Sequence, residues 1–318
     1  MVDSMVEEWR DHLILSRDFA VPADRQQLFS RVRRGELVPV LRGAYVESEV
    51  WNDMDPDARY RAHVKAVAAQ HGRDLVFSHG TAAALWRLPW ADRWPSVVHV
   101  TSEKAAGGRS NASLFRHTVG LPESSVRIDG LRATTLARTV VDVARTSSFA
   151  QAVVVADAAL RRTTHPLRTV PMTNLTCDEL LAELGSVPVR HGSAKARAVI
   201  AFADGDADRP GESLSRVSMR AAKLPKPELQ TAIVGASGRV WIVDFWWPAF
   251  NLVGEFDGKA KYSDPVYLRG RTLRQALLDE KDREDDIRAA GPRMSRWGWN
   301  LARSPRLLRA HLLAAGLK

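Results

Sequence analysis

The residues whose chemistry is most evident lie in a short acidic stretch near the carboxy-terminal end. Glu255, Asp257 and Lys259 alternate along an otherwise apolar sequence, and Asp244 precedes Glu255 by eleven residues. Carboxylate oxygens are the ligands that Mg²⁺ prefers, and a nearby ammonium group can orient a water molecule or stabilise a phosphate. The pattern therefore predicts a metal site for phosphodiester hydrolysis. The alternative is a hairpin with one charged face toward water, on which Lys259 neutralises Asp257.

Two neighbouring strands must position these side chains. An apolar run ahead of Pro248 indicates one strand, and a second strand begins at Leu252 after a tight turn. Side chains two residues apart share one face of a strand, so the charged triplet points to one side. A turn centred midway between the strands places Asp244 opposite Glu255, with Cβ atoms about 5 Å apart. Like charges this close destabilise a sheet unless a cation joins them, which favours the metal site.

The two strands belong to a predicted order of helix, three strands, helix, strand and helix. Glu212 falls in the first turn of the first helix, and Gln230 lies on the first strand. After the opening helix from Pro210, we expect strands over 227–234, 241–245 and from 252, a helix over 273–290, a strand over 294–301 and a helix over 305–315.

Glu212, Asp244 and the charged triplet, placed on these elements, closely resemble the motif of PD-(D/E)xK nucleases. The segment is similar to the small domains akin to very-short-patch repair endonucleases. The resemblance implies a restriction-endonuclease-like α/β domain in which Asp244 and Glu255 bind Mg²⁺ or Mn²⁺. It also implies that Glu212 tunes the site from its helix and that Gln230 assists.

The triplet departs from the usual motif at one position. Two residues after Glu255, where Lys is usual, the sequence holds Asp257. The resemblance makes Asp257 either a further metal ligand or the acidic member of a motif that ends at Lys259. Lys259 would orient the water or stabilise the pentavalent phosphate. Which pair of carboxylates contacts the metal stays open.

The first fifty residues combine a helix and a hairpin. The helix opens at Pro22 and ends at Gly35, and two short apolar runs flank a turn at Gly43. This is the outline of a winged helix-turn-helix, whose exposed helix can read a major groove or hold phosphates. The alternative is a solvated helix face. The candidate nucleic-acid contacts are Arg25, Gln26, Arg31, Arg33, Arg34 and Arg42.

Two stretches of this front segment, 33–37 and 41–46, resemble the amino-terminal winged helix of AbiEi-type antitoxins. The stretch 78–85 resembles a recurring element of the same proteins. The resemblance implies a repressor that also neutralises a nucleotidyltransferase-like toxin. The sequence departs from that pattern over 13–21, which is too short for the usual first two helices.

Residues 51–205 predict a mixed α/β domain with little recognisable chemistry. His79, His99 and His117 are irregularly spaced, so we expect hydrogen-bonded or surface histidines in place of a metal set. Cys177 is the single cysteine, which excludes a disulfide framework and a thiolate zinc site.

The charge balance of the chain is basic. Lysine and arginine number 46 against 37 aspartate and glutamate, giving a net charge of +9. This favours a polyanionic partner, nucleic acid before membrane, with ordinary solubility charge as the alternative. On the last long helix, Arg274 and Lys281 are expected to follow a phosphate backbone, or else to belong to a solvated helix of mixed charge. With no apolar leader and no run of about eighteen apolar residues, we expect a cytoplasmic protein without a membrane partner.

These patterns predict an α/β multidomain protein of three parts. They are a winged-helix-like segment (1–50), an antitoxin-like mixed α/β domain (51–205) and a PD-(D/E)xK nuclease-like domain (206–318). We expect a Mg²⁺-dependent nuclease that hydrolyses nucleic acid, DNA favoured, in defence or in a toxin-antitoxin setting. The alternative is a non-catalytic AbiEi-like antitoxin and repressor that binds DNA and a partner toxin.

Overall fold

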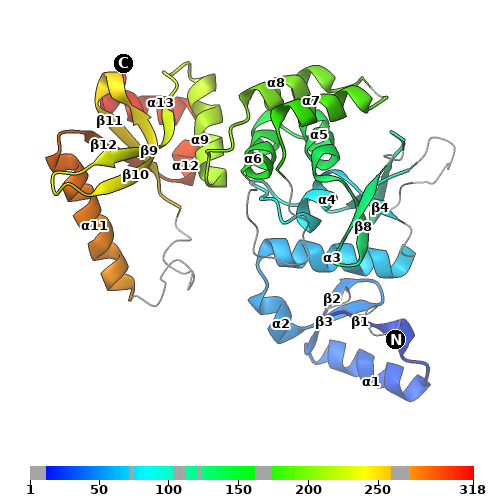
Figure 1. Ribbon diagram of the computed structural model, residues 1–318. Coiled ribbons are helices and arrows are strands. Elements are labelled where there is room, and N and C mark those ends of the chain that lie inside the picture. Colours follow the sequence, from blue (N-terminus) through cyan, green and yellow to red (C-terminus); the bar gives the residue numbers. More distant parts are fainter. Residues whose placement is uncertain are drawn as a thin grey trace. The chain divides into compact units, whose positions relative to one another are not determined.

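The chain is a multidomain α/β protein made of two compact units (Figure 1). The computed structural model describes residues 12–71, 75–102, 110, 112–120, 124–161, 174–188, 190–258 and 272–318. Unit 1 comprises 1–148 and 162–201, and unit 2 comprises 149–161 and 202–318. Across the described ranges, no helix is both long and apolar enough to cross a membrane.

The amino-terminal part of unit 1 is a helix followed by a small antiparallel sheet, which confirms the predicted helix and hairpin. Pro22 occupies the first turn of the helix, where a missing N–H leaves no hydrogen bond unmade. Leu28, Leu37 and Tyr45 form the core beneath it. The sheet order is β1-β3-β2. The elements are β1 (Ile14–Leu15), η2 (Ser16–Asp18), α1 (Pro22–Arg33), β2 (Leu37–Leu41), β3 (Ala44–Glu47) and α2 (Ser48–Asp53).

The rest of unit 1 is a mixed sheet with helices packed in succession. Its elements are α3 (Pro56–His71), β4 (Val76–Phe77), α4 (His79–Leu85), β5 (Val98–Thr101), β6 (Leu114–His117), β7 (Ser125–Ile128), β8 (Leu131–Thr134), α5 (Leu136–Thr146), α7 (Cys177–Ser186) and α8 (Ser193–Phe202). The sheet order is β6-β5-β4-β8-β7. Helix α3 packs on α4, α4 on α5 and α5 on α7. Every residue of α4 is buried, so this short helix lies in the core of the unit.

Unit 2 contains the predicted order of helix, three strands, helix, strand and helix. The elements are α6 (Phe149–Leu160), α9 (Pro210–Ala221), β9 (Glu228–Val234), β10 (Val240–Trp247), η4 (Pro248–Phe250), β11 (Leu252–Phe256), α11 (Leu273–Ala289), β12 (Arg293–Trp297), α12 (Trp299–Ala302) and α13 (Pro305–Ala314). The sheet order is β12-β11-β10-β9, with β11 and β12 parallel and the other pairs antiparallel. Helix α6 lies earlier in the chain and packs on α9 within this unit.

One predicted element of unit 2 is wrong in part. The last strand was expected to run to Leu301, but it ends at Trp297, and α12 follows after Gly298. A short apolar run fits a buried strand and a buried helix equally well, so periodicity could not separate the two.

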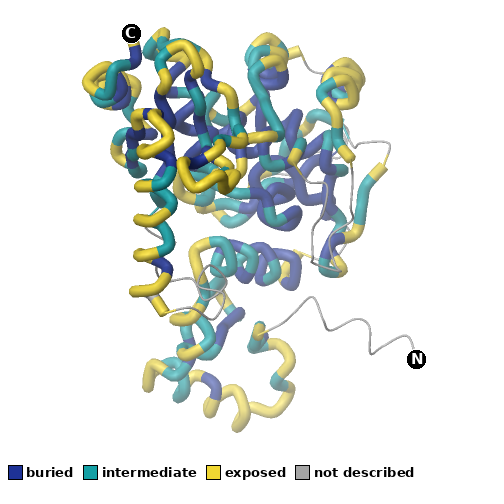
Figure 2. The backbone as a smooth tube through the Cα atoms, turned by 60° about the vertical axis from the view of Figure 1, so that its left-hand side comes forward, coloured by how far each residue is buried: buried dark blue, intermediate teal, exposed yellow. Residues whose placement is uncertain are grey.

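The sheet of unit 2 is covered on both faces. On one face, Ile287 of α11 packs against Val243, Val253 and Met294. On the other face, the indole N–H of Trp297 donates to Ser215 of α9 at 2.8 Å. Strand β11 is buried along its whole length, whereas most residues of α11 are exposed (Figure 2). The site described next lies where this buried sheet meets the exposed helix.

Candidate active site

The hairpin of β10 and β11 places Asp244 where the sequence predicted it. The turn consists of η4 and Asn251, whose φ of 44° is left-handed. Phe245 pairs with Gly254, and the same register places Asp244 opposite Glu255. Oδ2 of Asp244 accepts a hydrogen bond from the backbone N–H of Phe256 at 2.8 Å. This bond fixes one oxygen of the carboxylate against the neighbouring strand.

Strand β10 changes its alternation at Asp244. Val243 and Trp246 both pack against the α11-side core, although residues three apart point to opposite faces of a regular strand. The ladder to β9 pairs the residues on either side of Asp244, but Asp244 and Gln230 are not partners. Gln230 has a φ of 46°, a strain of about 1–3 kcal/mol for a residue that is not glycine. At this irregularity, the ladder between β9 and β10 is interrupted at Asp244.

Glu212 reaches this point from the first turn of α9. Its side chain is buried, and Oε2 accepts hydrogen bonds from the N–H of Asp208 at 2.9 Å and from Nε2 of Gln230 at 3.1 Å. Burial raises the pKa of Glu212 to about 8, and the negative charge of Asp244 adds to the rise. Glu212 therefore keeps its proton at neutral pH, close to the carboxyl group of Asp244.

Gly211 allows the helix to approach this closely. A Cβ atom at residue 211 would overlap the ring of Phe256 on β11, so only glycine fits between helix and strand. The first turn of α9 therefore lies against β11, the strand that carries Glu255.

Glu255 is buried, with 4% of its surface exposed, and is bracketed by two arginines. Its Oε1 lies 2.5 Å from Nη2 of Arg283 on α11, and its Oε2 lies 3.1 Å from Nη2 of Arg296 on β12. Burial raises the pKa of Glu255, the two guanidinium groups oppose that rise, and Asp244 adds to it. Although Oε1 is ion-paired, it accepts no hydrogen bond.

Asp257 and Lys259 complete the predicted motif. Asp257 follows β11, where its N–H donates to the carbonyl of Trp297 at 2.8 Å. Its Oδ1 is buried and has no hydrogen-bond partner in the described chain. Lys259 lies outside the described residues.

A cavity of about 730 Å³ opens beside Asp244. It lies between α11 and the region of β10, and its lining is mainly charged. The lining residues are Asp208, Arg209, Ser237, Arg239, Trp241, Asp244, Ala276, Asp279, Glu280, Asp282, Arg283 and Asp286. A polar cavity of this kind suits a charged or strongly hydrated ligand.

The donor set fits a hard divalent cation by its chemistry. Asp244, Glu255 and Asp257 offer carboxylate oxygens, and Oδ1 of Asp257 is buried without a hydrogen-bond partner in the described residues. In the described parts of the chain, however, no three His, Cys, Asp or Glu side chains already converge as a metal-binding group. The carboxylate of Glu255 is ion-paired with Arg283 and Arg296.

The residues of the front segment that are predicted to contact nucleic acid lie on α1, at its end or in the hairpin turn. Arg31 pairs with Glu36 and Glu47, and Arg34 pairs with Glu36, so both lie within the helix-hairpin module. Nε of Arg25 donates to the carbonyl of Phe19. Arg33 donates to Ser30, Gln26 is exposed, and the carbonyl of Arg42 accepts from Gln70. Within residues 12–21, a short strand and a 3-10 turn precede α1, with no α-helix.

On α11, Arg274 and Lys281 are both exposed. Arg283 and Arg288 of the same helix are engaged with acidic side chains, Arg288 with Glu284 at 2.7 Å. The helix is therefore one of mixed charge whose free cations lie on its solvent side.

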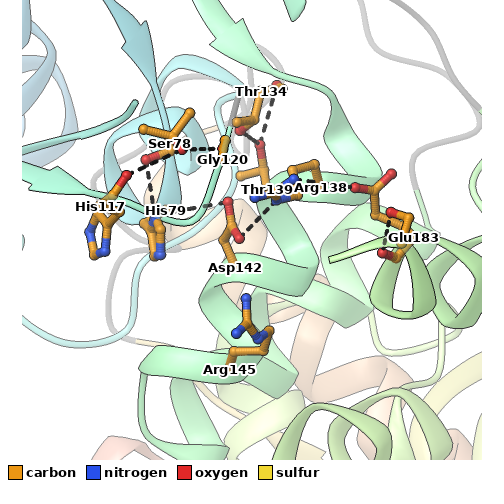
Figure 3. A network of polar contacts seen from close by, with 12 residues as sticks. Ser78, His79, His117, Gly120, Thr134, Arg138, Thr139, Asp142, Arg145 and Glu183 are labelled. Atoms are coloured by element: carbon orange, nitrogen blue, oxygen red, sulfur yellow. Dashed lines mark hydrogen bonds and ion pairs between the residues drawn. The ribbon is translucent and has the colours of Figure 1, made fainter. Parts of the chain in front are cut away.

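Unit 1 contains a cluster of histidines and other polar side chains that the spacing in the sequence did not predict (Figure 3). His79 and His117 stack with ring centroids 3.5 Å apart, and Nδ1 of His99 lies 2.8 Å from Nε2 of His117. His79 has a φ of 53° and lies 2.9 Å from the hydroxyl of Ser78. The strands and the helix that carry these histidines are far apart in sequence, so only tertiary structure brings them together.

Asp142 of α5 lies beside His79 (Figure 3). Its Oδ1 accepts a hydrogen bond from Arg138 at 3.0 Å, and its Oδ2 is 3.9 Å from Nδ1 of His79. Burial lowers the pKa of His117 to about 4 and lowers those of His79 and His99, whereas it raises the pKa of Asp142 to about 6. The imidazoles are therefore neutral near pH 7, as expected of the hydrogen-bonded histidines that the sequence predicted.

Comparison with known proteins assigns the chain to a family. No protein-family model matches it. Over 257 residues it is 33% identical to the uncharacterized protein Rv2248 of Mycobacterium tuberculosis strain H37Rv, a match that covers 80% of this chain and 86% of the relative. The uncharacterized protein MT2308 of strain CDC 1551 matches to the same extent. The chain belongs to the same family as these mycobacterial proteins.

One solved structure is also similar. The crystal structure of the RV2827C protein from Mycobacterium tuberculosis covers 67% of this chain and 79% of that chain, with a TM-score of 0.36 and 12% sequence identity.

Proposed function

We propose that unit 2 is a Mg²⁺-dependent nuclease that hydrolyses phosphodiester bonds of nucleic acid, DNA favoured, in the cytoplasm. The observation that carries the proposal is the position of Asp244, which lies opposite buried Glu255 on the neighbouring strand and close to buried Glu212. Burial raises the pKa of Glu212 on α9 and of Glu255 on β11, and the charge of Asp244 adds to both rises. A fold that only needed stability would gain nothing from this arrangement, because neighbouring carboxylates repel one another.

The PD-(D/E)xK resemblance supports the same reading, because helix, strands and carboxylates occur in the order that such a domain needs. In this proposal Asp244, Glu255 and Asp257 hold the metal, and Gln230 orients Glu212 through its hydrogen bond. When bound, Mg²⁺ would polarise the phosphate and favour ionisation of the attacking water. Glu212 would accept the proton of that water, and Lys259 would steady the charge on the phosphate.

The first test is cleavage of supercoiled plasmid and of labelled single-stranded DNA and RNA, in Mg²⁺, Mn²⁺ and EDTA. Asp244→Asn keeps the shape and an acceptor for the N–H of Phe256 but removes the charge. We expect a loss of metal-dependent cleavage of about a hundredfold or more, typical of removing one group that stabilises the transition state. Asp285→Asn, an exposed acid of α11 outside the cavity lining, is the matched control and should cleave normally.

Equal inactivity of the wild type and Asp244→Asn in every metal would contradict the nuclease. Loss of activity in both Asp244→Asn and Asp285→Asn would show that cleavage depends on the acidic charge of α11 and is not specific to the carboxylate site.

A second candidate is an AbiEi-like antitoxin or repressor that binds DNA and a partner toxin without cleaving. The observation that favours it is the ion-pair network on Glu255, which neutralises this carboxylate without a metal. Intact DNA or toxin binding by a protein that cleaves nothing in any metal would support this candidate.

A further inference from the structure

Arg283 is ion-paired with Glu255, one of the candidate metal ligands. Its Nη2 is 2.5 Å from Oε1 of Glu255, and its Nη1 donates to Oε2 at 3.2 Å. The same Nη2 donates to the carbonyl of Ile242 at 2.6 Å, two residues before Asp244. The guanidinium is thereby fixed between the two strands that carry the candidate metal ligands.

Arg296 differs from Arg283 in its partners. Besides Glu255, it lies 2.8 Å from Glu280 and 3.2 Å from Glu284, so its charge is shared among three carboxylates. It is absent from the lining of the 730 Å³ cavity, whereas Arg283 lines that cavity together with Asp244. Of the two arginines on Glu255, Arg283 is the one that a ligand in the cavity would meet.

We propose that Arg283 is a built-in competitor of the metal: it neutralises Glu255 in the metal-free protein and gives up this carboxylate when a divalent cation binds. Its guanidinium then stays in the cavity and contacts a phosphate of the nucleic acid. The proposal rests on the proposed nuclease function and adds a residue to it, because Arg283 comes from α11 and lies outside the predicted motif. A guanidinium suits this role since it binds carboxylate and phosphate in the same forked geometry.

The test measures metal binding apart from cleavage. Isothermal titration with Mg²⁺ and Mn²⁺ at pH 8 compares the wild type, Arg283→Gln, Arg283→Lys and Arg288→Gln. Removing the competitor in Arg283→Gln should tighten metal binding about fivefold to tenfold, within the range of coupling between linked ligands. Arg283→Lys should bind metal nearly as the wild type does. Arg288→Gln, which loses an ion pair to Glu284 on the same helix, should leave the affinity unchanged.

Cleavage by the same proteins supplies the second readout. Arg283→Gln should cleave more slowly although it binds metal more tightly, and Arg283→Lys should recover part of the rate. A merely structural arginine would weaken both properties together. The melting temperature of each variant shows that unit 2 is folded under the conditions of the titration.

Two results would overturn the inference. Metal affinity of Arg283→Gln equal to or weaker than that of the wild type would do so, even if the protein proves to be a nuclease. The absence of metal binding by the wild type and by Arg283→Gln would also overturn it. Tighter metal binding by Arg283→Gln in a protein that cleaves nothing would support the inference while contradicting the nuclease.

Discussion

At the scale of single residues, Glu212 is the group whose ionisation we expect to control the site. It is buried beside Asp244, and its pKa of about 8 means that it is mostly protonated at pH 7. A protonated carboxyl group accepts no proton and is a poor ligand for a cation. In the proposed nuclease, Glu212 is therefore held in its inactive form until the pH rises or a cation binds.

We predict that metal-dependent cleavage increases as the pH rises from 7 to 9, following the ionisation of Glu212. A bound cation favours the charged form, so the midpoint should shift to lower pH as the Mg²⁺ concentration is raised. Initial rates across this pH range at two Mg²⁺ concentrations provide the measurement. Glu212→Gln should be slow at every pH and should lose the rise. A Glu212→Gln profile that keeps the wild-type slope would assign the ionisation to another group.

At the scale of elements, the contact between α9 and β11 sets the distance between the carboxylates. Gly211 lies against Phe256, and no side chain fits between them. The opposite strand contributes the strained Gln230, which holds Glu212 from the other side. The helix and the sheet thus position Glu212 together, and neither could do so alone.

Gly211→Ala should therefore affect both stability and activity. A Cβ at this position forces α9 away from β11, and we expect a loss of about 1–3 kcal/mol in the free energy of unfolding of unit 2, typical of overpacking. The rate of cleavage should fall by more than the loss of folded protein accounts for, because Glu212 moves with the helix. Urea unfolding and initial rates measure the two effects.

Gly185→Ala is the matched control. Gly185 lies in α7 of unit 1 with open space where a Cβ would be placed. Alanine there should leave cleavage unchanged and stabilise unit 1 by up to about 1 kcal/mol. Normal cleavage by Gly211→Ala would show that the close approach of α9 is not needed.

At the scale of the whole molecule, the two units bury titratable groups of opposite kind. Unit 1 buries neutral histidines, with the pKa of His117 lowered to about 4 and those of His79 and His99 also lowered. Arg138 and Arg145 on α5 face the same cluster. Unit 2 buries carboxyl groups, and the pKa values of Glu212, Glu255 and Asp157 are all raised.

We predict that the stabilities of the two units respond to pH in opposite directions. In unit 1 the unfolded histidines bind protons from pH 6.5 downward and the folded ones do not, so stability falls with acid. Asp142, with its pKa raised to about 6, opposes this loss, but it is one group against four histidines of lowered pKa, which are His63, His79, His99 and His117. In unit 2 the unfolded carboxyl groups ionise near pH 4.5 and the folded Glu212 near 8, so stability falls as the pH rises between these values.

Calorimetry in EDTA at pH 5, 6.5 and 8 measures this behaviour. His117→Asn should flatten the response of one transition and Glu212→Gln that of the other, which assigns each transition to a unit. Glu212→Gln should also raise the melting temperature of unit 2 at pH 8, because the buried charge is removed. A single transition that shifts in one direction for all variants would contradict the prediction.

The local features of this protein follow from its sequence. Pro22 and Gly35 mark the ends of the α1 segment, and the turn after Pro248 fixes the register that places Asp244 opposite Glu255. These features depend on residues close together in the chain, whose preferences for φ and ψ and for alternating faces act independently of the rest of the fold. The order of elements in unit 2 and the α/β class were predictable for the same reason.

Only the tertiary structure decided which groups meet. Arg283 is 28 residues from Glu255, and His117 is 38 residues from His79, yet each pair is in contact. It also decided that Asp244 lies beside Glu212 and that the strand is irregular at Gln230. Such meetings depend on how helices and sheets pack over many side chains at once, and no spacing within one segment encodes that packing. The sequence by itself determined the carboxylates and the strands that carry them, while packing determined which cation faces Glu255.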